Sequence, residues 1–286
     1  MNKSYIVITP ARDEERFLPF LIESIVRQTI KPRRWIIIDD GSADATALLA
    51  DAAAKEHPFI QVHHLKRDRV RKRGGASIVM RYLPREVWQD ADFILRLDAD
   101  ISFGPAVIQS LMAEFERDPA LGIAGATLLE RRGRALGYNP IPDFHVRGDT
   151  KMYSRACFEA IRGLEAGPGW DTIDETRAMM RGFRTRSFTH INAIHHRPLG
   201  AADGQWRVLL AGGRAAYHAG YSPLFLAARA ARRSLSAPVG LAGILLMYGY
   251  LGAWLRREPR TAELDLVRFV RKQQRRRLLM METVWK

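Results

Sequence analysis

The chain has 286 residues, of which 47% are hydrophobic and 27% are charged. This length and apolar content favour a globular protein with a large core and exclude a disordered chain. A lone cysteine, Cys157, cannot form an internal disulfide, and no Cys/His group has zinc-finger spacing, which favours a reducing compartment. The first residues lack the apolar stretch of a signal peptide, so we expect the cytosol or the cytosolic face of a membrane.

The formal net charge of +14 is distributed unevenly along the chain. Residues 213–286 hold fourteen Lys/Arg and four Asp/Glu, which leaves a net charge of only +4 for the first 212 residues. We therefore expect a domain over residues 1–212 and a basic, apolar helical region over 213–286.

Strand-like and helix-like segments alternate over the first 130 residues, which predicts an α/β sheet with crossover helices. The expected strands are 4–10, 34–40, 59–65, 92–100 and 122–130, and the expected helices are 14–29, 45–56 and 105–118. Beyond them we expect a loop or lid over 131–147, helices within 152–165 and 167–183, and a strand and loop over 184–198.

Polar residues follow three of the expected strands, in the stretches "TPARDEE", "DDGS" and "DAD". Ligands of open α/β sheets bind in the crevice beyond the carboxyl ends of the strands. We therefore expect the three stretches to share one crevice.

Asp98 and Asp100 stand two residues apart at the end of a buried strand. Strand alternation puts both carboxylates on one face, where they suit Mg²⁺ or Mn²⁺ bound together with substrate phosphates. The alternative is a strand exit with two solvated acids.

In "DDGS", Asp40 fits a contact with a base or ribose, and the alternative is a tight turn that Asp stabilises while Gly41 takes a positive φ.

The ordered set "ITPARDEE", "IIIDDGSADAT", "LRLDAD" and "GWDTIDETRAMMRGF" resembles the family 2 glycosyltransferases, which have the GT-A (Rossmann-like) nucleotide-sugar-binding fold. The resemblance covers roughly residues 4 to 200. It implies transfer of a sugar from a nucleoside diphosphate donor, with UDP favoured, usually with inversion and with Mg²⁺ or Mn²⁺. The chain lacks an ordered Gln-x-x-Arg-Trp motif, so it resembles the non-processive members, of the bacterial cell-surface glycan type.

The resemblance also assigns roles to individual residues. The nucleotide-binding residues it implies are Pro10, Ala11, Arg12, Glu14, Asp39, Asp40 and Asp98, with Arg71 and Arg73 facing the diphosphate or lying in a solvated loop. The metal ligands it implies are Asp98, Asp100 and, from a late histidine in "HHRP", His196.

The family's catalytic base usually stands in a Glu-Asp pair that opens a helix. Asp171 matches that position, but Trp170 replaces the Glu. Asp174 and Glu175, one turn later, are the competing candidates for the base. Their alternative role is that of acids near a helix N-terminus, favoured by the helix dipole.

The basic tail contains nineteen uncharged residues, 237–255, flanked by arginines. Such a segment fits a short membrane span or an interfacial hairpin, and residues 262–286 fit a basic amphipathic helix on an anionic membrane. The alternative is a helix packed on the catalytic domain. We expect a membrane-associating extension on the cytoplasmic face, peripheral or held by a single hydrophobic segment, and a glycan or lipid-linked acceptor.

Two other functions compete with sugar transfer. The sequence pI near 10.4 invites nucleic-acid binding, but the basic excess lies beside an apolar stretch and not on a recognisable reading element, so we expect no nucleic-acid partner. A nucleotidyltransferase also combines a parallel sheet with metal-binding acids, yet no P-loop signature is present.

Overall fold

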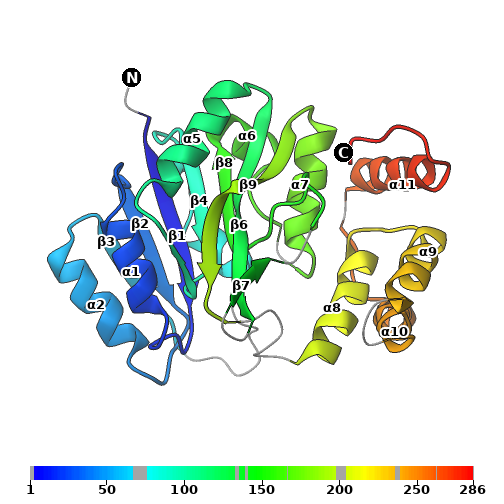
Figure 1. Ribbon diagram of the computed structural model, residues 1–286, viewed down its shortest axis with the longest axis horizontal. Coiled ribbons are helices and arrows are strands. Elements are labelled where there is room, and N and C mark those ends of the chain that lie inside the picture. The colour runs from blue at the N-terminus through cyan, green and yellow to red at the C-terminus, as the bar shows by residue number, and fades with distance from the viewer. Residues whose placement is uncertain are drawn as a thin grey trace.

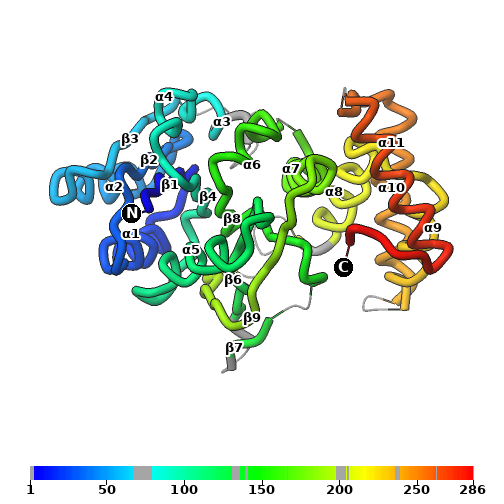
Figure 2. Tube along the Cα trace, turned by 90° about the horizontal axis from the view of Figure 1, so that it is seen from above, coloured from blue at the N-terminus to red at the C-terminus, as the bar shows by residue number. Residues whose placement is uncertain are grey.

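The computed structural model describes residues 3–66, 76–132, 135–138, 141–165, 167–197, 204–235, 239–261 and 263–285. Figure 1 shows a mixed sheet with helices on both faces and a separate group of helices beside it. Figure 2 shows the same two parts from above, with the helical group at one end of the long axis.

The sheet is built from nine strands of the described residues, in the order β3-β2-β1-β4-β8-β6-β9-β5, with β7 beside β6. Neighbours are parallel from β3 to β4, and β8 runs antiparallel to both β4 and β6. The strands are β1 (Tyr5–Ala11), β2 (Arg34–Asp39), β3 (Ile60–His64), β4 (Phe93–Leu97), β5 (Ile101–Phe103), β6 (Leu121–Arg132), β7 (Ala135–Tyr138), β8 (Thr150–Ser154) and β9 (Arg184–His195).

Helices cover the two faces of the sheet and bury alternate residues of its strands. One core contains α1 (Leu18–Val26), α2 (Thr46–Glu56) and α5 (Val107–Arg117). The other contains α3 (Ala76–Arg81), α4 (Arg85–Trp88), α6 (Arg155–Ala160) and α7 (Trp170–Met180). Strand β2 supplies Trp35 and Ile37 to the first core and Ile36 and Ile38 to the second. Burial on both faces explains its uninterrupted apolar run.

The expected strands and helices of the first 130 residues are confirmed as β1 to β4, β6, α1, α2 and α5, with ends shifted by a few residues. The prediction was wrong over residues 152–154, which belong to strand β8 and not to a helix. Helix α6 starts only after Ser154, whose side chain caps it by accepting the Cys157 N–H at 3.2 Å. Within the predicted loop 131–147 the structure places β7.

The C-terminal region contains α8 (Gln205–His218), α9 (Pro223–Ser234), α10 (Leu241–Leu255) and α11 (Leu264–Leu278). The predicted domain boundary at residue 213, where the composition changes, falls within helix α8, which begins before it and continues past it. These helices share a core with residues of α7, including Ile173. In the described part of the chain, no helix has both the length and the apolar content needed to cross a membrane.

The structure buries only part of the apolar face that the sequence predicts for the last helix, which comprises Leu264, Val267, Val270, Leu278, Met281 and Trp285. Leu266 and Val270 of α11 are buried, whereas Leu264 is 68% exposed. Trp285 follows the helix and its ring lies 6.2 Å from that of Phe144. The C-terminus is therefore folded back onto the sheet domain, as the packed-helix alternative predicts for this helix.

Candidate active site

The first two predicted motifs meet where β1 and β2 end. Arg12 Nη1 lies 3.5 Å from Asp40 Oδ2, and both side chains are buried. The main-chain N–H of Asp40 donates to the Ala11 carbonyl at 2.8 Å, and Pro10 and Ala11 are the last, buried residues of β1. Since a buried carboxylate needs a compensating charge, Arg12 and Asp40 form one charged unit at the sheet edge.

Asp39, next to Asp40, serves the turn that follows β2. Its Oδ1 accepts the Ser42 N–H at 2.9 Å, and its Oδ2 lies 3.1 Å from His64 Nδ1. The hydrogen bond with Asp39 raises the pKa of His64. Gly41 has a φ of 69° in this turn. Asp39 therefore stabilises the turn after β2, as the tight-turn alternative predicts, whereas Asp40 faces Arg12.

Arg197, just beyond β9, connects the loop after β1 with the end of β4. It forms an ion pair with the Glu14 carboxylate, and its Nε lies 3.8 Å from Asp100 Oδ2. The main-chain N–H of Glu14 donates to Thr46 Oγ1 at 2.7 Å, which fixes the loop on α2. Glu14 and Asp100 are both buried. Two of the three predicted strand ends are joined by this one arginine.

The side chain of His195 lies beside the Asp100 carboxylate, whereas His196 contacts Asp100 through its main-chain N–H, which donates to the Asp100 carbonyl at 2.9 Å. The Nε2 of His195 lies 3.4 Å from Asp100 Oδ2, and its Nδ1 lies 3.5 Å from Glu130 Oε1. Burial alone lowers the pKa of His195, but the hydrogen bond with Asp100 and the surrounding carboxylates raise it overall. His196 Nε2 instead lies 2.8 Å from Ser102 Oγ, and its ring stacks on Phe20 at 4.7 Å.

Asp98 is half-buried and lies in a second cluster of charged side chains. Its Oδ1 accepts from Arg96 Nη2 at 2.7 Å, and its main-chain N–H donates to the Asp149 carbonyl at 3.0 Å. Arg147 lies 2.8 Å from Asp149 and 3.2 Å from Glu130. Burial raises the pKa of Asp98; Arg96 opposes the rise and Asp149 adds to it, so the pKa lies above its ordinary value.

Asp98, Asp100 and His195 carry donor atoms of the types that bind a hard divalent cation. Carboxylate oxygens suit Mg²⁺ and Mn²⁺, and a carboxylate on the second nitrogen of a histidine orients such a ligand, as Glu130 does for His195. Over the described ranges, however, no group of three or more His, Cys, Asp or Glu side chains is arranged to hold a metal ion. Further ligands would come from a diphosphate and water.

Asp171 lies in the first turn of α7, close to the Asp98 cluster. A Cβ added at Gly148 would lie 2.9 Å from Trp170 Cζ2 and 3.6 Å from Asp171 Cβ. The segment around Gly148 and the start of α7 are therefore in tight contact. Arg96, the partner of Asp98, donates to the Gly148 carbonyl, and its guanidinium lies 4.7 Å from the Trp170 ring. Arg96 and Gly148 therefore connect Asp98 with the start of α7.

Asp174 and Glu175 are buried behind Asp171 and are already paired. Lys151 Nζ lies 2.8 Å from Asp174 and 3.0 Å from Glu175, and all three side chains are at most 2% exposed. Tyr153 donates to Asp174 at 2.5 Å. Burial raises the pKa of Asp174 to about 6, against the opposing effect of Lys151. Both carboxylates are buried and paired with Lys151, whereas Asp171 is the partly exposed one of the three candidates.

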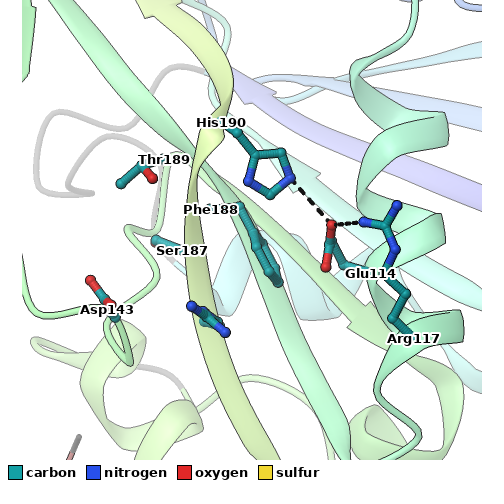
Figure 3. A pocket seen from close by; sticks show the side chains of 8 residues that line it. Glu114, Arg117, Asp143, Ser187, Phe188, Thr189 and His190 are labelled. Atoms are coloured by element: carbon teal, nitrogen blue, oxygen red, sulfur yellow. Dashed lines mark hydrogen bonds and ion pairs between the residues drawn. The ribbon is translucent and has the colours of Figure 1, made fainter.

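Arg71 and Arg73 lie outside the described residues. One cavity, of about 280 Å³, is lined by Glu114, Arg117 and His190, and none of its lining residues belongs to the predicted site. Figure 3 shows Glu114 between His190 and Arg117, with which it interacts. The predicted site residues are thus joined by ion pairs and backbone contacts at the strand ends, away from this cavity.

Several residues of the site were not singled out from the sequence. They are Arg96, Glu130, Arg147, Gly148, Asp149, Lys151 and Arg197. For His195 a signal was present: Ile191, Ala193 and His195 are the alternate, buried residues of β9. Strand alternation therefore separates His195 from His196, and the pairing of Ile101 with His195 brings β9 to the end of β4.

The family model described as "Glycosyl transferase family 2" matches residues 6–183, which is more than half of the chain. The chain belongs to glycosyl transferase family 2. The matched segment contains Arg12, Asp40, Asp98, Asp100 and Asp171 and ends just after α7. The helical region from α8 onward lies outside it.

Curated relatives match over a shorter stretch. An undecaprenyl-phosphate 4-deoxy-4-formamido-L-arabinose transferase of Pectobacterium carotovorum is 35% identical over 114 residues, 38% of this chain and 33% of that protein. A second, from Pectobacterium atrosepticum, is 34% identical over the same length. The match thus spans about a third of the length of these relatives.

Solved glycosyltransferases share the fold at low sequence identity. The mannosyltransferase PcManGT from Pyrobaculum calidifontis, in complex with GDP-Man and Mn²⁺, is 15% identical with a TM-score of 0.57, covering 94% of this chain and 73% of that one. S. aureus TarS 1-349 in complex with UDP also gives 15% and 0.57, covering 97% and 86%. These likenesses confirm the GT-A-like α/β fold.

Proposed function

We propose that this protein transfers a sugar from a nucleoside diphosphate sugar to an acceptor hydroxyl with inversion. The observation that carries the proposal is the meeting of Arg12 with Asp40, of His195 with Asp100 and of Asp98 with Arg96 at one edge of the sheet. Membership of family 2 favours sugar transfer over the nucleotidyltransferase alternative. UDP is the favoured nucleotide, because the resemblance implies it and a solved neighbour binds it.

Asp171 is the proposed catalytic base. It accepts the proton of the acceptor hydroxyl while the hydroxyl oxygen bonds to the anomeric carbon and the carbon–diphosphate bond breaks, its electron pair leaving with the diphosphate. Of the three candidate acids, Asp171 is the one that is partly exposed; Asp174 and Glu175 are held by Lys151. Gly148 and Trp170 hold the start of α7 in place.

Asp98, Asp100 and His195 are the proposed holders of Mg²⁺ or Mn²⁺. A divalent cation there would neutralise charge on the leaving diphosphate. His195 replaces His196 in this proposal, because His195 faces Asp100.

Arg12 and Asp40 hold the base and ribose, and Glu14 orders their loop through Arg197.

We propose a lipid-linked acceptor, because the Pectobacterium relative is named for undecaprenyl phosphate. Such an acceptor would place the enzyme on the cytoplasmic face of a membrane in cell-surface glycan assembly.

A panel of UDP- and GDP-sugars tests the proposal, with Mn²⁺ or Mg²⁺ and with EDTA. We expect one donor to raise the melting temperature and to be hydrolysed slowly, and both effects to fall with EDTA. A protein that responds to none of the sugar nucleotides but to a nucleoside triphosphate would contradict it.

A further inference from the structure

Helix α10 packs inward through small residues together with Leu246 and Tyr250, and exposes several large apolar side chains on its opposite face. Glycines allow this close packing: a Cβ added at Gly249 would lie 2.1 Å from the Leu210 carbonyl oxygen of α8, and one added at Gly243 would lie 2.3 Å from the Ala230 carbonyl oxygen of α9. Ala242 and Ala253 are also fully buried. The backbone of α10 is therefore pressed against its neighbours by its smallest residues.

The opposite face of α10 forms an exposed apolar stripe. We define the α10 stripe as Leu241, Ile244, Tyr248, Leu251 and Leu255, which recur at helical spacing. Each is at least 45% exposed, with Ile244 at 62% and Leu255 at 71%. A helix at the surface of a soluble protein normally turns polar residues outward, and α10 contains no charged residue at all. Contiguous exposed apolar surface of this kind marks an interaction site.

The charged residues around the stripe are almost all positive. Residues 204–261, which contain α8, α9 and α10, hold eight arginines and one acidic residue, Glu258. Arg232 and Arg233 end α9 on one side of α10, and Arg256 and Arg257 follow it on the other. All four are exposed. An apolar stripe between two pairs of arginines is complementary to a bilayer with anionic headgroups.

A hollow at the C-terminal end of the stripe extends this surface. It has a volume of about 580 Å³ and is lined by Trp254, Leu255, Arg257 and Arg260, among others. Arg260 lies over the Tyr217 ring at 4.3 Å. Trp and Arg side chains place apolar atoms in the hydrocarbon boundary and polar atoms among headgroups.

We propose that the α10 stripe and its flanking arginines dock this protein on an anionic lipid bilayer, with α10 lying in the plane of the membrane. The proposal rests on the proposed function in one respect, because a lipid-linked acceptor gives the docking its purpose. In Figure 1, α10 lies at the same height in the view as the carboxyl ends of β1 and β4, toward the bottom. With 15 residues, α10 suits an interfacial position.

Vesicle co-sedimentation of the full chain tests the docking. The wild type is expected to bind vesicles of phosphatidylcholine with phosphatidylglycerol more tightly than phosphatidylcholine alone. The double variant Leu251→Gln/Leu255→Gln should lose at least about tenfold in binding to both, because its apolar side chains no longer enter the boundary. Leu48→Gln, on α2 and 73% exposed, is the matched control and should bind as the wild type does.

The arginines are tested separately. Arg232→Gln/Arg233→Gln should weaken binding to the phosphatidylglycerol vesicles by about 5-fold for each arginine and leave phosphatidylcholine binding unchanged. Arg27→Gln/Lys55→Gln, both exposed on α1 and α2 or directly beyond, is the charge-matched control. Equal binding of all variants would overturn the proposal.

Size-exclusion chromatography distinguishes the competing occupant of the stripe. A wild-type dimer that Leu251→Gln/Leu255→Gln converts to a monomer, with no vesicle binding, would make the stripe an interface between copies and overturn the proposal. Melting-temperature shifts with the sugar nucleotide, measured without vesicles, should be the same for all these variants. Vesicle binding therefore tests the docking proposal, and the melting-temperature response to the sugar nucleotide tests the proposed function, so each can fail without the other.

Discussion

The two halves of the candidate site are stabilised in different ways. At the ends of β1 and β2, Asp39 closes its own turn through Ser42, and Asp40 forms an ion pair with Arg12 at the end of the neighbouring parallel strand. Around β8 and α7, a fully buried lysine, Lys151, neutralises two acids that follow it by more than twenty residues. We call these the nucleotide half and the acceptor half.

The difference indicates a division of labour. In the nucleotide half the buried side chains of Arg12 and Asp40 pair with each other at the carboxyl ends of β1 and β2. In the acceptor half Lys151, Asp174 and Glu175 are buried, whereas Asp171 is partly exposed. The buried network of Lys151, Asp174, Glu175 and His145 thus supports the first turn of α7, and its side chains do not contact a substrate in our proposal.

The largest expected effect separates the two halves by kinetics. Asp171→Asn should lower kcat by about 10²- to 10⁴-fold, the usual contribution of a general base, and leave donor affinity unchanged. Steady-state transfer assays and donor titration measure the two quantities. Asp40→Asn should instead weaken donor binding and leave kcat largely unchanged, since it disturbs the ion pair with Arg12.

Asp90→Asn, at an exposed position, is the matched control for the loss of one carboxylate. Normal transfer by Asp171→Asn would remove Asp171 from the mechanism. Because Asp174 and Glu175 are buried, the base would then have to come from outside α7.

The next largest effect tests the buried charge of the acceptor half. Lys151→Met leaves Asp174 and Glu175 without their cation and should reduce the free energy of unfolding by about 3–5 kcal/mol. Lys55→Met, at an exposed position of α2, should change it by less than about 0.5 kcal/mol. Urea denaturation measures both. A small effect of Lys151→Met would mean that the two acids take up protons at little cost.

The sequence predicted the meeting of Arg12 and Asp40 because the signal at each strand exit is local. An apolar run that ends in carboxylates and a Gly-Ser turn describes β2 and its exit without reference to the rest of the chain. Parallel neighbours then place such exits at one edge, which brought Arg12 and Asp40 together as expected. The basic segment with Arg71 and Arg73 stays a prediction, since it lies outside the described residues.

The acceptor half depends on pairing between distant segments, which residue patterns do not contain. Strand β8 inserts antiparallel between β4 and β6, and only this register places Lys151 opposite Arg96 on β4. Read alone, "MYSRACFEA" favours a helix. The same long-range pairing of β9 with β5 sets His195 beside Asp100, where the sequence favoured His196.

A smaller effect tests the contact between Gly148 and α7. Gly148→Ala puts a methyl group 2.9 Å from the Trp170 ring, so Trp170 and the neighbouring Asp171 must shift. We expect kcat to fall and the free energy of unfolding to drop by about 1–3 kcal/mol, as overpacking does. Gly104→Ala is the matched control, because an added Cβ there meets nothing within 4 Å. Equal kcat for the two variants would show that the tight contact does not position Asp171.

The smallest effect concerns pH and the pair of His145 with Glu175, whose atoms lie 2.9 Å apart. Burial alone lowers the pKa of His145, but Glu175 and, less strongly, Asp171 outweigh burial and the opposing Lys151, so the pKa is raised above 6.5. The stabilisation is therefore complete below pH 6.5 and is lost as pH rises through the raised value.

Glu175 titrates in the opposite direction. Burial raises its pKa, but Lys151 and His145 outweigh burial, so the pKa is lowered below 4.5 and its stabilisation is lost only in stronger acid. Melting temperatures on both sides of pH 6.5 should therefore decline more steeply toward high pH for the wild type than for His145→Gln. Parallel curves for the two proteins would show that folding does not shift the pKa of His145, and the support of α7 would then come from Lys151 alone.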